Sequence, residues 1–519
     1  MKTNPFRSIG ADFPASIVVL LVAIPLCLGI ALGSNAPLFS GLIAGIVGGV
    51  VIGILSGSQL SVSGPAAGLT VIVAGGIATL PSWEAFLMAV VLAGVFQIIF
   101  GSIRAGIIGD YVPNAVIKGM LAAIGIILIL KQLPHLVGYD EDFLGDESFQ
   151  QADHENTFSE LIHMMGALQM GAVLVGILSM LVLIIWERPF MKKMSWSKLV
   201  PGPLVAVLVG TFAHLILRNT GSAHSIQPEH LVQIPVASSF TGFIGLFSSP
   251  DFSSIALSEV WVLAITLALV ASLETLLSIE AVDKIDPHKR ITPPNRELLA
   301  QGAGNMLSGL IGGLPVTSVI VRSSANVNSG GETKLSAILH GVMLFLCVAL
   351  IPGVLNNIPL ASLAAILIFT GYKLAKITLF REFWSKGMDQ FVPFVVTIVA
   401  ILFTDLLIGV CIGIGISIIF LLRTNFHSAI MIVHDGDNYL LRFRKSVSFL
   451  NKPLIKKELR KIPSNSHLII DTAMSDFIDM DVIDTVNEFL VSARDRNITV
   501  SMDKHGQRRS QAFFQTNDN

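Results

Sequence analysis

Two ionisable side chains, Arg322 and Glu274, stand inside long apolar stretches of this 519-residue chain. Moving such a charge into hydrocarbon costs from about 3 to more than about 10 kcal/mol, so an intramembrane charge is by default a functional hypothesis. A guanidinium offers forked donors that suit an anion. A buried carboxylate can carry a proton, or it can bind a cation together with an oxygen ligand such as Ser278, one helical turn after Glu274. Structural alternatives stay open, because Arg322 could instead reach the membrane interface or pair with Glu274.

Two short segments, residues 61–68 and 312–319, each interrupt an apolar stretch with an extended piece and then a helix start, at Pro65 and Pro315 respectively. Non-helical backbone at membrane depth is tolerated only where it is buried in protein or lines a cavity. Such breaks at corresponding places in two halves of a chain are typical of secondary transporters built from inverted repeats. Each helix N-terminus presents roughly half a positive charge. Two such ends could hold one anion between them, with Arg322 reaching back along its helix to add a full charge.

The elements that must position these residues are membrane helices. Of all residues, 52% are hydrophobic and 13% are charged, and the mean hydropathy is +0.72. This composition is typical of a polytopic membrane protein and not of a soluble globular one. We count roughly fourteen apolar segments between residues 13 and 422, several of them shorter than the ~20 residues of a straight transmembrane helix. The first apolar run continues into further ones, which argues against a cleavable signal peptide. The sequence therefore predicts an all-α membrane domain.

Several classes of function find no support in the sequence. The three cysteines, Cys27, Cys347 and Cys411, lie in apolar segments without metal-ligand spacing and are interpreted as small hydrophobic residues. No set of nucleophile, base and orienting residue stands out, so we do not predict an enzyme. The net charge of −2 gives no indication of nucleic-acid binding.

Lys and Arg gather in three short loops, residues 192–198, 284–296 and 373–386, whereas residues 132–187 contain Asp and Glu but no Lys or Arg. Basic loops lie preferentially on the cytoplasmic side, so the acidic loop is predicted to face outside. Fourteen crossings then leave both termini in the cytoplasm, with the chain in the cytoplasmic membrane. Residues 295–297, in the second basic loop, are interpreted as helix capping and surface charge.

The composition changes near residue 425, where apolar residues begin to alternate with polar ones. We therefore predict a membrane domain at residues 1–425 and a small cytoplasmic α/β domain at residues 426–519. The expected order is a hairpin, a helix near 452–461, a buried strand at 467–471, a helix around 482–494 and a strand at 498–500, with at least one crossover connection.

In combination these residues resemble the SulP family, the sulfate permeases whose animal relatives include pendrin and prestin. The resemblance covers almost the whole chain and is carried by residues 61–66, 272–278, 295–305, 312–315 together with Arg322, and a tail like a STAS domain. It implies fourteen membrane segments in a seven-plus-seven inverted repeat, at about 10–218 and about 258–425. It further implies an architecture shared with uracil permeases, an elevator-like cycle, a homodimer, and contacts of the tail with a cytoplasmic protein partner.

The resemblance also implies an anion site between the starts of the third and tenth helices, with the first helix closing one side. Carried over by position, its residues are Ala66, Ala67, Gly68, Thr317, Ser318, Val319 and Arg322, together with Leu26 and Ile30 of the first helix.

This chain departs from the family pattern in three places. Leu26 stands where many relatives have Gln after the first-helix Pro, which removes a polar contact to the substrate. Glu274 and Ser278 stand where sodium-driven bicarbonate members have Asp and Thr, so the coupling ion is open between Na⁺ and H⁺. Residues 479–481 lack the hydroxyl that regulatory STAS domains phosphorylate.

These observations predict a secondary active transporter of a small inorganic anion, bicarbonate or sulfate, embedded in membrane lipid and driven by Na⁺ or H⁺, with no cofactor beyond that ion. A nucleobase or organic anion permease of the same fold is one alternative, although such permeases place an acid where this chain has Arg322. The other alternative is a membrane scaffold or receptor that acts through its STAS-like tail, for example by recruiting a carbonic anhydrase.

Overall fold

The chain forms two compact units, residues 1–414 and 415–519. The computed structural model describes residues 8–140, 149, 156–194, 200–220, 224–236, 240–428, 430–444, 446–475 and 477–503. Much of the predicted acidic loop, at residues 141–148 and 150–155, lies outside the described residues. Residues 195–199 of the first basic loop also lie outside them. The units divide inside the last helix of the first unit, whereas the composition changes about ten residues later.

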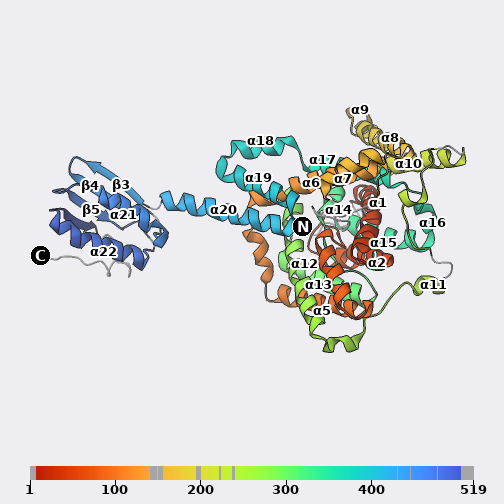
Figure 1. Cartoon of the computed structure of the whole chain (residues 1–519), viewed down its shortest axis with the longest axis horizontal. Helices are drawn as coiled ribbons and strands as arrows, with labels where there is room; N and C mark the ends of the chain where they lie inside the picture. Colours follow the sequence, from red (N-terminus) through yellow and green to blue (C-terminus); the bar gives the residue numbers. More distant parts are fainter. Residues whose placement is uncertain are drawn as a thin grey trace. The chain divides into compact units, whose positions relative to one another are not determined.

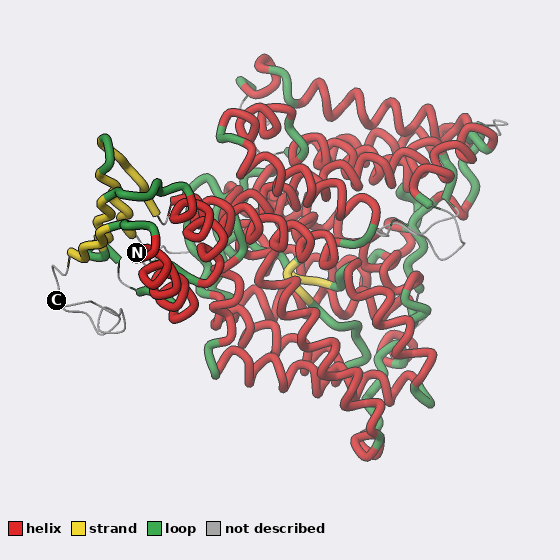
Figure 2. Tube along the Cα trace, turned by 60° about the vertical axis from the view of Figure 1, so that its left-hand side comes forward, coloured by secondary structure: helices red, strands yellow, loops and turns green. Residues whose placement is uncertain are grey.

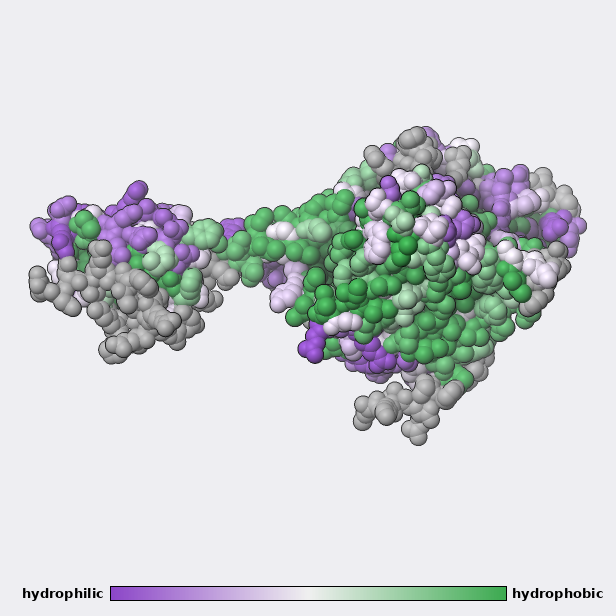
Figure 3. Space-filling view, turned by 90° about the horizontal axis from the view of Figure 1, so that it is seen from below, coloured by the Kyte–Doolittle hydropathy of each residue, from purple (hydrophilic) through white to green (hydrophobic). Residues whose placement is uncertain are grey.

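The first unit is a bundle of helices with a predominantly apolar surface, whereas polar side chains gather on the second unit (Figures 1 and 3). The helices are α1 (Ile9–Gly33), α2 (Leu38–Val47), α3 (Gly53–Leu55), α4 (Thr70–Thr79), α5 (Trp83–Ser102), α6 (Asn114–Val137), α7 (Thr157–His163), α8 (Met170–Trp186), α9 (Pro189–Lys192), α10 (Gly202–Asn219), α11 (Phe240–Ile244), α12 (Ser258–Ile285), α13 (Pro294–Leu310), α14 (Ile320–Asn328), α15 (Leu335–Leu350), α16 (Pro352–Leu355), α17 (Leu360–Leu374), α18 (Ile377–Ser385), α19 (Met388–Phe403) and α20 (Leu406–Ser428).

Eight spans among the described residues are long and apolar enough to cross a membrane, or nine if the sharply bent pair Thr157–Gly166 and Met170–Trp186 forms one span. Three shorter apolar helices, Ala67–Thr79, Leu335–Leu350 and Met388–Phe403, accompany them. The multi-pass character of the chain is thereby confirmed, while the count of fourteen segments stays a prediction. Length and apolarity cannot recognise α13 and α14, because α13 carries several polar residues and α14 has only nine residues.

Helix α1 lies at the centre of this unit. Its most apolar 18-residue window is 89% buried, whereas that of α20 is 17% buried. The helix runs without interruption through Pro14 and Pro25, and it packs against α2, α14, α15 and α17. A helix that is apolar on all sides must be surrounded by protein or lipid. For α1 this environment is mostly protein, because the neighbouring helices surround it.

Two short strands lie among the helices, visible as the yellow pair inside the red bundle in Figure 2. They are β1 (Ser63–Gly64) and β2 (Thr317–Ser318), and they pair antiparallel. Helix α2 is followed by a π-helical segment, Gly48–Ile52, which passes close to β1. A Cβ atom added at Gly48 would lie 2.3 Å from the carbonyl oxygen of Ser63. Glycine is therefore required there by the close approach of the strand.

The second unit contains a four-stranded sheet with strand order β3-β4-β5-β6. Its elements are β3 (Ile430–Asp435), β4 (Asn438–Phe443), α21 (Lys452–Arg460), β5 (His467–Asp471), α22 (Met480–Asp495) and β6 (Thr499–Asp503). β3 and β4 form an antiparallel hairpin, and β4, β5 and β6 are parallel neighbours. The predicted order of hairpin, helix, strand, helix and strand is confirmed, because alternating strands and amphipathic helices with a buried central strand are strong local signals.

The close passage of β1 generates a test with a matched control. We expect Gly48→Ala to lower the thermal stability of the detergent-solubilised protein, since overpacking typically costs about 1–3 kcal/mol. Gly75→Ala in α4, where a Cβ would meet nothing within 4 Å, should leave stability unchanged or raise it slightly through helix propensity. Thermal unfolding followed by intrinsic fluorescence measures both variants, and equal melting temperatures would contradict the close approach.

Candidate functional site

The structure brings the two predicted breaks together. Ser63 pairs with Ser318 and Gly64 with Thr317 across the β1–β2 ladder. The ladder continues through the backbone N–H of Val319, which donates to the carbonyl of Val62 at 3.0 Å. Beside it, the hydroxyls of Ser61 and Ser318 lie 2.5 Å apart. Segments more than 250 residues apart in the sequence thus satisfy each other's backbone within the bundle.

Both helix starts lie further along the chain than predicted. The first helix begins with the 3-10 turn η3 (Ala67–Leu69) and continues as α4, whereas Pro65 remains in extended chain. The second begins at Ile320, well after Pro315. The prediction of helix starts at the two prolines was therefore wrong. At the first break the chain stays non-helical for Pro65 and Ala66 after β1, and at the second the residues that follow Pro315 are used in strand pairing. As a result Arg322 stands in the first turn of its helix.

The candidate anion-site residues surround this crossing with different degrees of exposure. Gly68 is exposed and Ala67 and Val319 are half-buried, whereas Ala66, Thr317 and Ser318 are buried. From α1, the side chains of Leu26 and Ile30 are buried, and α1 packs against both α4 and α14. The exposed part of the group is therefore at the first helix start, at Gly68, whereas Ile320, Val321 and Arg322 at the second helix start are buried. At both starts the first N–H groups of a helix lack partners within the helix.

Arg322 is fully buried, with an exposure of 0%, so it does not reach the membrane interface. Its Nη2 lies 3.4 Å from the Sγ of Cys27 in α1. A Cβ at Gly64 would be 1.9 Å from its Nη1, which means that the guanidinium lies directly against the backbone of β1. Nε and Nη1 have no hydrogen-bond partner among the described residues. A buried guanidinium with two such nitrogens, which carry three N–H groups, can bind an anion or water.

Glu274 of α12 lies on the other side of the first break. An added Cβ at Gly68 would be 3.1 Å from its Oε1, so the carboxylate sits beside the first helix start. Ser278, one turn later in α12, is buried. Glu274 and Gly68 also line a cavity of about 30 Å³ together with Asp405. Asp405 was not among the candidate residues, and only the tertiary structure places it next to Glu274.

The α13 helix holds the two extended segments through a row of polar side chains spaced four residues apart. Glu297 accepts from the hydroxyl of Ser56 at 2.5 Å. Gln301 donates to the hydroxyl of Ser63 at 2.8 Å. The interpretation of Glu297 as surface charge was wrong, because its exposure is 0%. The four-residue spacing, which places these side chains on one helix face, was the signal in the sequence.

Asn305 completes this row. Its Oδ1 accepts from the backbone N–H of Val316 at 2.6 Å, and its Nδ2 donates to the Val316 carbonyl at 2.9 Å. The same Nδ2 donates to Gln97 of α5 at 2.7 Å. Among the described residues, one amide thereby satisfies both backbone groups of the residue that precedes β2.

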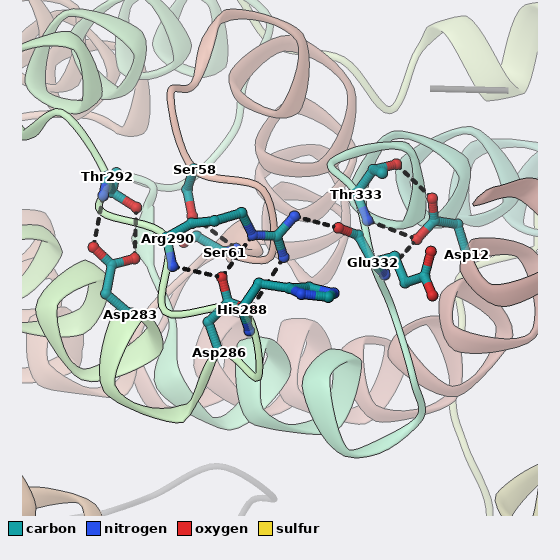
Figure 4. A network of polar contacts seen from close by, with 10 residues as sticks. All are labelled: Asp12, Ser58, Ser61, Asp283, Asp286, His288, Arg290, Thr292, Glu332 and Thr333. Carbon is teal, nitrogen blue, oxygen red and sulfur yellow. Dashed lines mark hydrogen bonds and ion pairs between the residues drawn. The ribbon is translucent and has the colours of Figure 1, made fainter. Parts of the chain in front are cut away.

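The second basic loop is built into a polar network at the ends of α1, α12 and α14 (Figure 4). Asp12 accepts from the backbone N–H groups of Glu332 and Thr333 at 2.8 and 2.9 Å. Arg290 donates from Nη1 to the carbonyl of Glu332 at 2.7 Å and from Nε to Asp286 at 2.7 Å. This network joins three elements that carry candidate site residues.

The Asn305 contacts generate a graded test. We expect Asn305→Leu to destabilise the protein by about 2–4 kcal/mol, because it leaves the buried N–H and C=O of Val316 unpaired. Ser308→Ala, which removes only the hydroxyl that donates to the carbonyl of Leu314 at 2.7 Å, should cost about 1 kcal/mol. Urea or heat denaturation of the solubilised variants compares them, and a Ser308→Ala effect as large as that of Asn305→Leu would argue against the assigned role.

Comparison with known proteins agrees with this architecture. The profile described as the Sulfate permease family matches residues 9–399. Among the relatives is the putative sulfate transporter YvdB of Bacillus subtilis, 28% identical over 79% of this chain and 73% of its own length. The bicarbonate transporter BicA of Picosynechococcus sp. is 26% identical over 79% of this chain and 70% of its own length. The sodium-independent sulfate anion transporter of Bos taurus is 25% identical over 95% of this chain and 83% of its own length.

Solved structures share the fold. The transmembrane domain of a cyanobacterium bicarbonate transporter BicA matches with a TM-score of 0.54 and 22% identity, covering 80% of this chain and 98% of that chain. The murine Slc26a9 anion transporter in the inward-facing state matches with a TM-score of 0.67 and 14% identity, covering 97% of this chain and 86% of that chain. Since the profile spans most of the sequence and the helical bundle matches such structures, this chain is a multi-pass membrane protein that belongs to the sulfate permease family.

Proposed function

We propose that the protein is a secondary active transporter of a small inorganic anion, bicarbonate or sulfate, across the cytoplasmic membrane. The observation that carries the proposal is the juxtaposition of two helix starts with a fully buried Arg322 whose Nε and Nη1 have no partner among the described residues. A bound oxyanion would accept from such donors and offset the cost of burying the guanidinium. Relatives named as sulfate and bicarbonate transporters support the same substrate class.

The transport cycle we propose is elevator-like. The fourteen segments of a seven-plus-seven repeat would be α1, α2, α4, α5, α6, α8 and α10 in the first half and α12, α13, α14, α15, α17, α19 and α20 in the second. In this assignment β1 precedes the third segment and β2 the tenth, so that the breaks occupy equivalent places. Both termini would be cytoplasmic, and the second unit, as a STAS-like domain, would contact a cytoplasmic partner. The transporter would act as a homodimer in the membrane lipid.

Coupling to Na⁺ or H⁺ would involve Glu274 and Ser278. The Glu274 carboxylate beside Gly68 is close to one helix start, so a cation or proton bound there would change the charge next to the anion. A carboxylate in a small, partly apolar cavity can take up a proton, and a carboxylate with a neighbouring hydroxyl can ligate Na⁺. With either ion, binding at Glu274 and binding of the anion at the helix starts would depend on each other.

The experiment that tests the proposed function is uptake into proteoliposomes. Radiolabelled sulfate and bicarbonate are offered separately, each with and without an imposed Na⁺ or pH gradient. A competition panel then ranks unlabelled oxyanions and a nucleobase. Accumulation of an oxyanion above equilibrium under one gradient supports the proposal. Accumulation of none under either gradient would reject it.

We expect Arg322→Ala to lower apparent anion affinity by at least about tenfold, the loss of one charge-assisted contact in a buried setting. Arg381→Gln, on the exposed surface of α18, is the matched control and should behave as wild type. Concentration dependence of uptake measures the effect, and thermal unfolding checks that Arg322→Ala still folds. Wild-type affinity in a folded Arg322→Ala variant would exclude the proposed role of this side chain.

We expect Glu274→Gln to abolish accumulation against a gradient while leaving exchange of internal for external anion measurable, because the neutral amide can neither release a proton nor offer a charged ligand. Glu280→Gln, which removes a half-exposed partner of Lys284, serves as the control. If the Glu274→Gln protein still concentrates anion as wild type does, the coupling role is wrong.

A further inference from the structure

Helix α15 carries a fully buried histidine, His340. Its exposure is 0%, and neither Nδ1 nor Nε2 has a hydrogen-bond partner among the described residues. A neutral imidazole has one N–H donor and one acceptor nitrogen. Leaving both groups unpaired in a buried place costs free energy. A folded protein that keeps such a side chain therefore has a partner or a function for it.

The residues around His340 on the same face of α15 show which way this face is turned. Helix α15 lies beside α1 and α2 (Figure 1) and packs against the π-helical segment that follows α2. Ala337, one turn before His340, clusters with Val62, the residue that precedes β1. A Cβ atom added at Gly49 would lie 2.6 Å from the Cα of Gly341, the residue after His340. This face of α15 is therefore turned toward the first break.

Leu344, one turn after His340, approaches the guanidinium of Arg322. A Cβ atom added at Gly45 of α2 would lie 2.9 Å from Cδ2 of Leu344 and 3.8 Å from Nη1 of Arg322. Arg322 is also the charged group that interacts electrostatically with His340. Two fully buried side chains with unpaired polar atoms therefore share one region of the bundle.

The unpaired atoms of the two side chains are complementary. Nε and Nη1 of Arg322 can only donate, whereas His340 has one nitrogen that accepts. A second positive charge beside a buried guanidinium is unfavourable, so the imidazole is neutral and keeps this acceptor. Among the described residues no direct hydrogen bond joins the two side chains. A buried water molecule, which typically makes two to four hydrogen bonds, can accept from Arg322 and donate to His340.

We propose that His340 is a positioning residue for Arg322, linked to the guanidinium through one buried water molecule. The link holds the guanidinium in one orientation and leaves its other free N–H groups for the anion. This inference rests on the proposed function, because it adds a residue to the same anion site. The competing interpretation is that His340 only fills space between α15 and its neighbours.

Two substitutions separate these interpretations, because Leu has no polar atom whereas Gln keeps a donor and an acceptor. We expect His340→Leu to raise the half-saturating anion concentration for uptake about fivefold, as the loss of one hydrogen bond does. The maximal rate should stay near wild type, since the link acts on anion binding. His340→Gln should bring the half-saturating concentration back to within about twofold of wild type.

The space-filling interpretation predicts a different pattern. The Leu and Gln variants would then have the same half-saturating concentration, and that result would overturn the inference. His340→Leu would also raise the melting temperature of the solubilised protein, because it removes two unpaired buried polar atoms. A raised melting temperature together with wild-type anion affinity in His340→Leu would likewise overturn it.

His214 of α10 provides a matched control. Its exposure is also 0%, and both of its ring nitrogens lack a partner among the described residues. The charged group that interacts with it is Arg218, not Arg322. His214→Leu should therefore leave the half-saturating anion concentration at the wild-type value. Equal effects of His214→Leu and His340→Leu would contradict a specific link to Arg322.

Cys27 reports on the guanidinium in the absence of transport. Its Sγ lies 3.4 Å from Nη2 of Arg322, and the S–H stretching frequency of a thiol depends on its hydrogen bonds. Infrared spectra of the full-length protein in detergent, minus those of the matching Cys27→Ala protein, isolate this band. We expect His340→Leu to shift the band and His340→Gln to leave it near the wild-type position. An unshifted band in His340→Leu would refute the link.

The two measurements separate this inference from the function on which it rests. If wild type transports no anion, the proposed function fails, and the S–H band still decides whether His340 positions Arg322. If wild type transports an anion and the two His340 variants differ in neither uptake nor the S–H band, the role of His340 alone is wrong.

Discussion

The constraint on which this structure depends is that backbone polar groups need partners wherever water is excluded. Two helices of the bundle are interrupted, and each interruption exposes N–H and C=O groups. The structure satisfies them by pairing the interruptions with each other as β1 and β2. Side chains from α13 complete the pairing, since Asn305 satisfies Val316 and Gln301 reaches Ser63. The polarity of α13, unusual for a membrane segment, follows from this task.

A second consequence of the pairing is the position of Arg322. Because β2 occupies Thr317 and Ser318, the helix begins late and the arginine falls in its first turn. Its guanidinium then lies against Gly64, where any side chain would collide with it. A buried charge beside two helix starts concentrates positive potential at one place. Such a charge is costly unless a counter-charge is present, and this cost is the physical basis of the proposed anion site.

The strength of electrostatic interactions at the crossing of β1 and β2 depends on how deeply the charges are buried. At the crossing, Arg322 is fully buried and its attraction for an anion is little screened. The same low screening would make the charge of Glu274, beside Gly68, felt by the proposed anion.

Local signals in the sequence predicted much of the fold. The apolar segments, the two breaks and the strand and helix order of the second unit follow from composition, periodicity and the special backbone of Gly and Pro, which are properties of short stretches of chain. Family resemblance predicted the anion-site residues, and the structure places most of them around one crossing, although it does not test their roles.

Other features depended on contacts between distant parts of the chain. The sequence alone determined that this is a polytopic membrane protein with paired interruptions and an isolated Arg322. These features follow from short stretches of chain, since an apolar stretch around a charge predicts its burial and nearby Gly and Pro residues predict the loss of helix. Only the tertiary structure decided that Arg322 meets Cys27 and Gly64, that Glu297 is buried against Ser56, and that both helices start after their prolines. Pairing between segments separated by hundreds of residues decides these details, and no local pattern records which partner will satisfy a given backbone or side-chain group.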